Sequence, residues 1–422
     1  MKTINSAEIE KFIKKLRKRS VSDPKIEERV RKILNEVFNK GDKALIKYTQ
    51  IFDKHTLPIK MKPKEIQTLA KKASKEVVKA LQFAAQRIRK FHERQLEKSW
   101  KYKEGDITLG QIIRSLHRIG AYVPGGKASY PSTVLMNIIP AQVAGVSEIA
   151  VCVPTPNGEI NPTVCAALEL LDIKEVYRIG GAQAIGALAF GTETIKKVDK
   201  IVGPGNIYVA TAKRLVFGEV DIDMIAGPSE IMIIADNSAN PAFIASDMLS
   251  QAEHDEMASS ILVTTSEKLA FEVKKEILKQ LKTLPKAEIA KKSLKNFGAI
   301  FLVKSLKEAT DVANKIAPEH LEIMTENPEE LLPMLKNAGA IFLGPWSTEP
   351  IGDYVAGPNH TLPTGGTARF FSPLGVYDFI KRSSLIKIGK KGFKEIAPYV
   401  EMLATLEGLQ AHANTVKIRK IT

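Results

Sequence analysis

Hydrophobic and polar positions recur at helical spacing in the first quarter of the chain. In the segment 61–100, the apolar residues Ile66, Leu69, Ala73 and Val77 follow one another three or four positions apart, with charged residues between them. This pattern predicts mostly helical structure over residues 1–104. We expect a basic N-terminal helix, a second helix at about 24–50 and a third at about 63–101.

From about residue 107 the pattern changes, and short β-rich runs alternate with helical segments that are punctuated by glycine. We predict buried strands at 148–156, 175–181, 199–206, 230–236 and 259–265, with a helical run between each strand and the next. Such alternation is typical of a parallel sheet with flanking helices. Several strands end in a Gly-Gly or Gly-Pro turn before a helix, which indicates two similar α/β halves.

The stretch 344–377 has little regular pattern and is crowded with glycine, proline and threonine. A stretch of this length is usually a functional loop or a disordered linker. Its aromatic residues, Tyr354, Phe370, Phe371 and Tyr377, favour an ordered loop. Helical signals return in the tail, over 401–420.

Composition is that of an ordinary soluble protein, since 44% of the 422 residues are hydrophobic and 26% are charged. The length suggests two to three domains. Cys152 and Cys165 do not have the spacing of metal ligands. These two cysteines suggest a reducing compartment rather than a disulfide framework. The chain starts with a polar, charged segment and has no run of about 18 apolar residues, so we expect a cytoplasmic protein that does not span a membrane.

The net charge of +15 comes from one end of the chain, because residues 1–104 hold 29 Lys and Arg against 13 Asp and Glu. Such charge runs are usually solvated helix faces. A nucleic-acid groove would also carry interleaved aromatic residues, and these helices have few. We therefore expect no nucleic-acid partner. The alternative, a nucleic-acid binder, predicts steeply salt-dependent binding that is indifferent to metal.

One candidate metal site begins in "SQAEHD" (250–255), where Gln251 and His254 are three residues apart and would share a helix face. Zinc favours histidine nitrogen and accepts oxygen ligands, so this pair could be half of a site. Asp353, in "IGDYVAGPNH", and His412, in "EGLQAHA", are candidates for the other half. Such a set would leave positions open for a substrate with nitrogen or oxygen donors.

Two glycine-rich turns, 180–186 and 202–213, each follow a predicted strand and open a helix. That geometry directs backbone N–H groups and the positive helix end at an anion such as a pyrophosphate. Neither turn is a complete GxGxxG, and the usual acidic residue for the ribose is missing. Close packing between helix and strand is the alternative interpretation.

A second candidate is the acid–imidazole pair Glu319–His320 in "IAPEHLEIMT" (316–325). Proline suits the first position of a helix, so Pro318 predicts that both residues lie in the first turn of a helix "EHLEIM". There the helix dipole would favour ionised glutamate and neutral histidine, the states that general bases need near neutral pH.

Taken together and in this order, the motifs resemble those of the histidinol dehydrogenase family from about residue 118 to residue 412. The segments that carry the resemblance are "YVPGGKASYPSTVLMNIIPAQVAGV" (122–146), "RIGGAQAIGALAFGTETI" (178–195), "VDKIVGPGNIYVATAKRLVFGEVDIDMIAGPSEI" (198–231), "SQAEHD", "APEHLEI", "GDYVAGPNHTLPTGGTARFFS" (352–372) and "EGLQAH" (407–412). The resemblance implies oxidation of L-histidinol to L-histidine, through the aldehyde, with two NAD⁺ and one Zn²⁺ per subunit.

The resemblance also assigns roles to residues. It makes His320 the base that takes the alcohol proton and Glu319 the base that activates water to attack the aldehyde. Zinc, which would hold the amine and imidazole nitrogens of the substrate, is ligated by Gln251, His254, Asp353 and His412. The substrate-binding set is Ser229, Gln251, His254, Glu319, His320, Asp353, His360, Glu407 and His412, and the NAD⁺-binding set is Tyr122, Gln183 and Asn206.

The fold that the resemblance implies is α/β, with two incomplete Rossmann-like domains and helical N-terminal and C-terminal extensions. We expect a helical part leading into the first α/β domain (1–121), an NAD-binding domain (122–229), the remainder of the first domain with the metal and catalytic residues (230–372), and a tail exchanged in a homodimer (373–422). Glu407 and His412 would then complete the neighbouring subunit's site.

Aldehyde oxidation often uses a cysteine nucleophile. Both cysteines here lie outside the site motifs, so we expect water to attack instead. A rival interpretation, a zinc hydrolase in which Glu319 activates metal-bound water, predicts turnover without NAD⁺.

Overall fold

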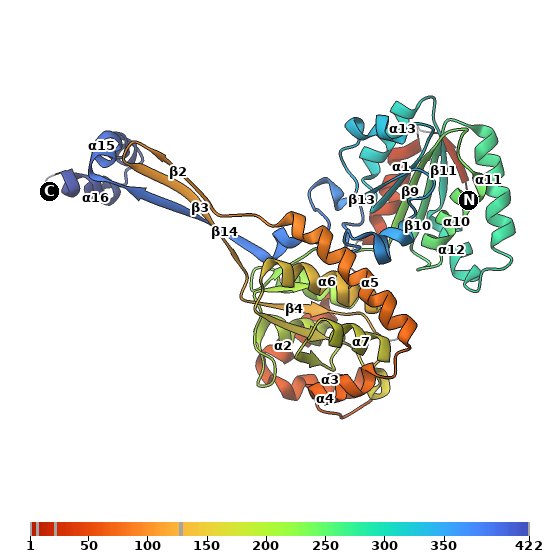
Figure 1. The fold of residues 1–422 in the computed structure, drawn as a ribbon, viewed down its shortest axis with the longest axis horizontal. Helices are drawn as coiled ribbons and strands as arrows, with labels where there is room; N and C mark the ends of the chain where they lie inside the picture. Colours follow the sequence, from red (N-terminus) through yellow and green to blue (C-terminus); the bar gives the residue numbers. More distant parts are fainter. Residues whose placement is uncertain (1, 6–7, 21–22, 126–129, 421–422) are drawn as a thin grey trace. The chain divides into compact units, whose positions relative to one another are not determined.

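The computed structural model describes residues 2–5, 8–20, 23–125 and 130–420 (Figure 1). The undescribed stretch 126–129 falls within the motif at 122–146. The chain divides into two compact units, one made of residues 1–95 and 116–379 and the other of residues 96–115 and 380–422. The first unit contains two parallel sheets, and the second contains one antiparallel sheet.

The smaller parallel sheet has the order β6-β5-β4-β7-β8. Its strands are β4 (Arg118–Tyr122), β5 (Glu148–Cys152), β6 (Glu175–Tyr177), β7 (Lys200–Val202) and β8 (Asp221–Ile222). Apolar side chains cover both of its faces in two separate clusters. One cluster includes α4 (Pro63–Ala70), α5 (Lys75–His92), α6 (Pro131–Ala144) and α7 (Pro162–Leu170). The other includes α2 (Pro24–Lys40), α3 (Asp42–Phe52), α8 (Gly181–Phe190) and α9 (Ile207–Val216).

The larger parallel sheet has the order β1-β11-β10-β9-β12-β13. Its strands are β1 (Lys2–Asn5), β9 (Glu230–Ala235), β10 (Ser259–Thr264), β11 (Ala299–Leu302), β12 (His320–Met324) and β13 (Ala340–Leu343). On one face pack α1 (Ile9–Arg17) and α13 (Leu306–Ile316), and on the other α10 (Pro241–Ala252), α11 (Glu267–Gln280) and α12 (Ala287–Phe297).

The two parallel sheets share one topology. With β1 left aside, the first strand of each sheet pairs with the second and the fourth, so the strand order reverses beside it, between β4 and β7 in one sheet and between β9 and β12 in the other. Strand β1 adds a sixth strand beyond β11. The predicted α/β class with two similar halves is therefore confirmed.

The predicted N-terminal helices are shorter and more numerous than the pattern indicated. The expected helix at 24–50 is divided into α2 and α3 by Gly41, whose φ of 50° is a conformation that favours glycine. The expected helix at 63–101 is two helices, α4 and α5. It ends at His92, and a strand begins at Trp100. The strand β1 was not predicted.

The second unit consists of β2 (Trp100–Glu104), β3 (Ile107–Ser115), β14 (Ile380–Ile388), α15 (Lys390–Leu406) and α16 (Gln410–Lys420). Strands β14 and β3 pair antiparallel from Ile380 opposite Ser115 to Ile388 opposite Ile107. Much apolar surface of this unit is uncovered in the single chain. The large apolar side chains that are more than half exposed include Trp100, Ile386, Tyr399, Met402, Leu403, Leu406 and Ile418.

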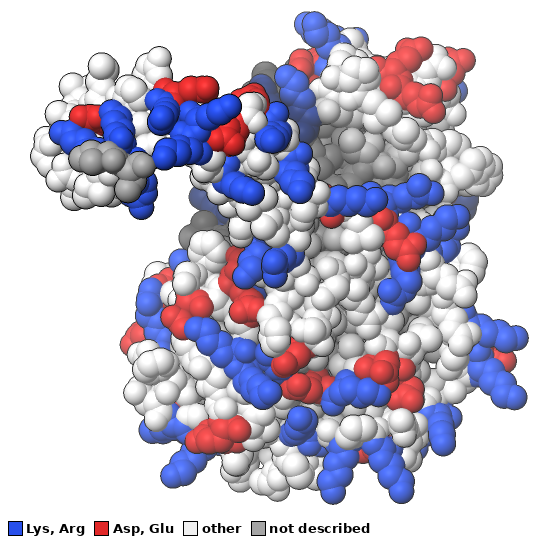
Figure 2. All heavy atoms as spheres, turned by 60° about the vertical axis from the view of Figure 1, so that its left-hand side comes forward, with Lys and Arg blue, Asp and Glu red and all other residues white. Residues whose placement is uncertain are grey.

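Charged side chains of both signs are mixed on one face of the molecule. On the face shown in Figure 2, Lys and Arg are interspersed with Asp and Glu. Among the described residues, no helix combines the length and the apolar character that crossing a membrane requires. Cys152 and Cys165 are both buried free thiols.

Candidate active site

The segment that carries Glu319 and His320 is the end of one helix and the start of a strand. Helix α13 ends at Ile316 and is followed by Ala317, which adopts the left-handed conformation with a φ of 53°. Pro318 follows, and β12 begins at His320. The prediction that Pro318 opens a helix "EHLEIM" is therefore wrong. Proline is common just after a helix as well as at its first position, and the sequence alone does not separate the two cases.

Both side chains of the pair are anchored on the backbone of one residue, Glu230, at the start of β9. The N–H of Glu230 donates to Oε2 of Glu319 at 2.8 Å, and Nδ1 of His320 lies 3.0 Å from the carbonyl oxygen of Glu230. Glu319 is 7% exposed and His320 3%. His320 Nδ1 and Glu319 Oε2 are 3.8 Å apart. The parallel pairing of β12 with β9 sets this arrangement, because it places His320 opposite Ile231.

Burial, and not a helix dipole, dominates the electrostatics of the pair. Burial raises the pKa of Glu319 to about 8, although His320 and the N–H of Glu230 oppose the shift. Burial lowers the pKa of His320, but the carboxylates of Glu319, Asp353 and Glu349 outweigh it and raise the value to about 10. Both shifts run opposite to the predicted bias toward ionised glutamate and neutral histidine.

Asp353 and Glu349 approach the second nitrogen of His320. Oδ1 of Asp353 lies 3.5 Å from Nε2 of His320. Metal-binding atoms of His320, Glu349 and Asp353 all lie within 4.8 Å of one another. Glu349 begins the short helix α14 (Glu349–Ile351), and Asp353 lies in the π-helical turn η6 (Gly352–Ala356) that follows. Sequence reasoning missed Glu349, although its position four residues before Asp353 is a signal for one shared face.

Gln251 and His254 come from the end of α10. Asn240 caps this helix, because its side chain accepts the N–H of Ala242, and Pro241 takes the first position. Gln251 is fully buried, yet neither its Oε1 nor its Nε2 hydrogen-bonds to a described part of the chain. His254 lies in the turn after α10. Its backbone N–H donates to the carbonyl oxygen of Gln251 at 3.2 Å. Although part of His254 is exposed, the surrounding protein lowers its pKa by desolvation.

Two further predicted substrate residues lie in the same unit. Nδ1 of His360 is 2.9 Å from the carbonyl oxygen of Asp353, and its Nε2 is 3.4 Å from Oγ1 of Thr133 on α6. Ser229 is half-buried directly before β9, where its carbonyl oxygen accepts the N–H of Ser259 at 3.0 Å. His360 is thus held against Asp353, and Ser229 directly precedes Glu230.

Glu407 and His412 belong to the second unit. Glu407 directly follows α15, His412 lies in α16, and both are exposed. Of the predicted zinc ligands, the first unit supplies Gln251, His254 and Asp353 and the second supplies His412.

Comparison with known proteins settles the family. Residues 16–420 match the family model of histidinol dehydrogenase. The chain belongs to the histidinol dehydrogenase family. It is 58% identical over 403 residues to a histidinol dehydrogenase of Aquifex aeolicus, covering 95% of this chain and 94% of that one. It is 53% identical to one from Syntrophotalea carbinolica, covering 93% and 92%.

A solved structure agrees with this membership. The crystal structure of histidinol dehydrogenase from Elizabethkingia anophelis superposes with a TM-score of 0.94 at 40% identity, covering 99% of this chain and 96% of that one. The predicted family and fold class are therefore confirmed. As a histidinol dehydrogenase, the protein is an NAD-dependent oxidoreductase of histidine biosynthesis.

Of the three residues predicted to bind NAD⁺, Tyr122 lies on a strand of the smaller parallel sheet, and Gln183 and Asn206 lie in segments that follow strands of that sheet. Tyr122 ends β4, and its hydroxyl accepts the N–H of Gly181 at 3.1 Å. Gln183 is buried in α8, and its Oε1 has no hydrogen-bond partner among the described residues. Asn206 is exposed and caps α9, accepting the N–H groups of Tyr208 and Val209.

The carboxyl ends of β4 and β7 form the edge where dinucleotides bind in related topologies, because the strand order reverses between these strands. Gly203 follows β7 with a φ of 109°, and a Cβ there would lie 2.1 Å from the carbonyl oxygen of Tyr122. Only glycine therefore fits this close approach. The glycine-rich turn at 202–213 thus has a packing role as well as a position suited to binding.

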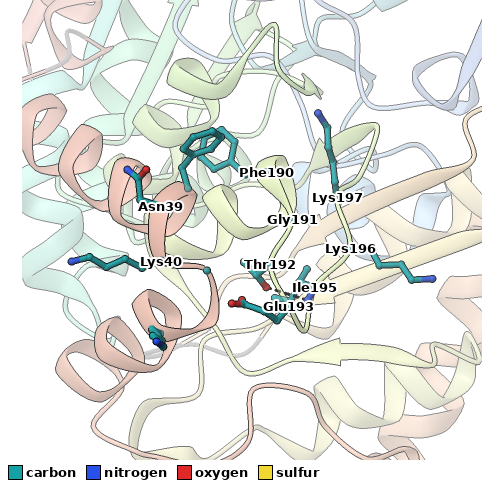
Figure 3. Close-up of a pocket in the computed structure, with 12 residues that line it drawn as sticks. Asn39, Lys40, Phe190, Gly191, Thr192, Glu193, Ile195, Lys196 and Lys197 are labelled. Atoms are coloured by element: carbon teal, nitrogen blue, oxygen red, sulfur yellow. Dashed lines mark hydrogen bonds between the residues drawn. The ribbon is translucent and has the colours of Figure 1, made fainter.

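A surface pocket of about 770 Å³ lies elsewhere in the first unit, between the end of α2 and the end of α8 (Figure 3). Lys40, Lys196 and Lys197 are among its lining residues. Its carboxylate, Glu193, already accepts the N–H of Asp42 at 2.8 Å, at the first residue of α3. None of the predicted site residues lines this pocket.

Proposed function

We propose that this family member oxidises L-histidinol to L-histidine in two successive NAD⁺-dependent steps, from alcohol to aldehyde and from aldehyde to acid. The observation that carries the proposal is the buried pair Glu319–His320, anchored on Glu230, in a chain 58% identical to a histidinol dehydrogenase. The first hydride transfer needs a base for the alcohol proton. The second needs an activated water, since the aldehyde must gain an oxygen. Two adjacent bases meet these two needs.

His320 serves the first step through Nε2. The carbonyl of Glu230 accepts a hydrogen bond from Nδ1, so the Nδ1 proton is fixed and the neutral ring carries its lone pair on Nε2. Nε2 is buried and makes no hydrogen bond within the described chain. Once Asp353 binds zinc, one of the carboxylates that raise the pKa of His320 to about 10 would be engaged, and the neutral ring would then take the proton of the substrate hydroxyl at Nε2 while hydride leaves the carbon for NAD⁺.

Glu319 serves the second step by removing a proton from the water that attacks the aldehyde. Its Oε2 is held by the N–H of Glu230, which leaves Oε1 for the water. Burial that raises its pKa to about 8 makes it a stronger base than an exposed carboxylate. The resulting hydrate then gives up the second hydride.

The zinc ligands we propose are Gln251, His254 and Asp353, with His412 from a second copy of the chain. Gln251 supports this set most directly, because a fully buried amide without partners is costly unless a ligand satisfies it. An amide oxygen, an imidazole and a carboxylate together suit Zn²⁺. When bound, the metal would act as a template that orients the amine and imidazole of the substrate.

A metal ion could instead be held by His320, Glu349 and Asp353, whose atoms are spaced for it. We favour the set with Gln251, because His320 is then left as a base and the unpartnered amide is explained. The two sets differ in a measurable way. Replacing His320 with asparagine should leave zinc content unchanged if the set with Gln251 is right, and should release zinc if the alternative is right.

For NAD⁺ we propose Tyr122, Gln183 and Asn206. Support comes from their placement in or after the smaller parallel sheet, where the strand order reverses between β4 and β7. Gln183 also has a buried Oε1 that makes no hydrogen bond to the described residues. Ser229, His360 and Glu407 complete the substrate-contacting set that we propose.

We propose that the protein is a homodimer in which Glu407 and His412 complete the partner's site. The exposed apolar side chains of the second unit support this, since contiguous surfaces of that kind in soluble proteins mark interfaces. Both residues lie in that unit. The two buried free thiols support a reducing compartment such as the cytoplasm.

The test is NADH formation from L-histidinol, followed by absorbance before and after chelation. Two NADH per histidine, lost on chelation and restored by zinc, are expected. No NADH from a folded, zinc-loaded sample would refute the proposal, as would turnover that does not need NAD⁺.

A further inference from the structure

A cluster of three buried carboxyl groups lies behind the candidate active site. Asp247 is 6% exposed, Glu322 1% and Glu349 2%. They come from α10 and β12, which carry site residues, and from α14, which directly precedes the turn η6 that holds Asp353. No arginine or lysine bonds to any of the three in the described chain. Their proximity therefore needs a different explanation from ion pairing.

Each carboxyl group lies two or four positions along the chain from a site residue. Asp247 precedes Gln251 by four positions on α10, so the two share a helix face. Glu322 follows His320 by two positions on β12, so the two point to the same face of the strand. Glu349 precedes Asp353 by four positions. Whatever fixes the carboxyl groups therefore also fixes the direction of the site residues.

Hydrogen bonds connect the three elements through these groups. The N–H of Glu349 donates to Oε1 of Glu322 at 2.8 Å, which ties α14 to β12. Oγ of Ser250 donates to Oε2 of Glu349 at 3.0 Å, which ties α10 to α14. The carboxyl groups of Asp247 and Glu322 contact each other, which ties α10 to β12.

The contact between the carboxyl groups of Asp247 and Glu322 leaves two buried oxygens without a hydrogen bond unless a proton lies between them. Oδ2 of Asp247 and Oε2 of Glu322 are both buried, and neither accepts a hydrogen bond from any donor in the part of the chain that is described. Two ionised carboxylates cannot lie in contact in a buried site without strong repulsion. One proton between them turns this repulsion into a hydrogen bond and satisfies both oxygens.

We propose that Asp247 and Glu322 share one retained proton and act as positioning residues, locking α10, β12 and α14 so that Gln251, His320 and Asp353 meet in one site. Burial also raises the pKa of Asp247 to about 6 and that of Glu322 well above its usual range. The assignment of a positioning role rests on the proposed oxidation of histidinol. The shared proton itself does not.

The first experiment measures kcat and KM for two substitutions of Glu322 that differ in hydrogen bonding. Glu322→Leu keeps the volume but removes the link, and should lower kcat roughly tenfold or more with KM for NAD⁺ unchanged. Glu322→Gln can still accept from the N–H of Glu349 and donate to Asp247. It should therefore stay within about threefold of the wild type. Asp378→Asn, which removes a half-buried carboxyl group elsewhere in the first unit, is the control and should keep kcat.

Two results would overturn the proposal. One is a folded, zinc-loaded Glu322→Leu variant with wild-type kcat. The other is a Glu322→Gln variant as impaired as Glu322→Leu, which would mean that the carboxyl group acts otherwise than as a hydrogen-bonding link.

A second measurement does not depend on the reaction. The infrared difference spectrum between the wild type and Glu322→Leu should contain the carbonyl stretch of a protonated carboxylic acid, and Asp378→Asn should leave that band in place. Absence of the band at neutral pH would refute the shared proton. If the band is present but the wild type does not oxidise histidinol, the proposed function fails and the carboxyl pair stands.

Discussion

Nδ1 of His320 lies 3.0 Å from the backbone carbonyl oxygen of Glu230. Because Glu230 opens β9 and His320 opens β12, the contact is set by the pairing of two neighbouring strands and not by a flexible loop. The N–H of the same residue holds Glu319. One residue therefore positions both proposed bases through its N–H and its carbonyl, and neither contact uses Nε2 of the histidine or Oε1 of the glutamate.

Replacing His320 should impair the first oxidation much more than the second. His320→Asn keeps a polar side chain but removes the base, and we expect alcohol oxidation to fall roughly 10²–10⁴-fold. The measurement compares NADH formation from L-histidinol with NADH formation from the aldehyde. Equal losses with both substrates would contradict a role confined to the alcohol proton.

Replacing Glu319 should have the opposite effect. Glu319→Gln can still accept the N–H of Glu230 but cannot take a proton from water, so the first oxidation continues and the aldehyde hydrate forms slowly. We expect the yield to approach one NADH per histidinol, with aldehyde trapped by a carbonyl reagent. His320→Asn serves as the control, since it should give little aldehyde. A yield that stays at two NADH would rule out Glu319 as the water-activating base.

Replacing Gln251 should weaken zinc binding without unfolding the protein. Gln251→Leu removes the amide whose two polar atoms have no described partner, so the buried site loses a ligand while an unsatisfied group is also removed. We expect loss of roughly 10–100-fold or more in zinc affinity, with Tm of the metal-free protein unchanged or raised. Zinc titration with a competing chelator, together with thermal unfolding, measures both. Unchanged zinc affinity would exclude Gln251 as a ligand.

Removing both cysteines should leave most of the activity. Cys152 is fully buried at the end of β5, and burial raises the pKa of its thiol far above neutral pH. Burial also raises the pKa of Cys165 to about 12. Neither is therefore a thiolate that could attack an aldehyde. Cys152→Ala with Cys165→Ala should cost some stability through the lost packing. Near-total loss of activity in a folded double variant would overturn the mechanism with water.

Much of the fold could be predicted from the sequence, because buried parallel strands leave continuous apolar runs bounded by glycine turns. The segments at 148–152 and 230–235 are strands for this reason. Helix ends were harder, since Pro318 looks the same to the sequence whether it follows one helix or begins another. The strand β1 is four residues long and depends on β11, nearly three hundred residues away.

The candidate site was predictable where chemistry-bearing residues form local patterns, as Gln251 and His254 do. The buried carboxyl groups were not predicted, because Asp and Glu are mostly surface residues and a sequence alone does not show the exceptions. Glu322 did leave a signal, since it lies between Leu321 and Ile323 in a strand whose five residues are all buried. An acid inside such a strand must have a partner, and that partner, Asp247, is visible only in three dimensions.

Acidic pH should destabilise the smaller parallel sheet, because Glu175 becomes protonated. The hydrogen bond from Arg118 lowers the pKa of Glu175 to about 2, well below its value of about 4.5 in the unfolded chain. A lowered pKa means that the ionised group stabilises the fold above pH about 4.5, and that this stability is lost as the pH falls toward 2. The contribution is on the order of 1–2 kcal/mol after screening by solvent.

Glu175→Gln should therefore lower Tm at neutral pH, and the difference from the wild type should shrink as the pH falls from 5 to 2. Thermal unfolding at a series of pH values measures it. The matched control is Glu169→Gln, at an exposed position on α7, which should show no such trend. A deficit for Glu175→Gln that stays constant down to the lowest pH would mean that packing, and not the charge paired with Arg118, accounts for the loss.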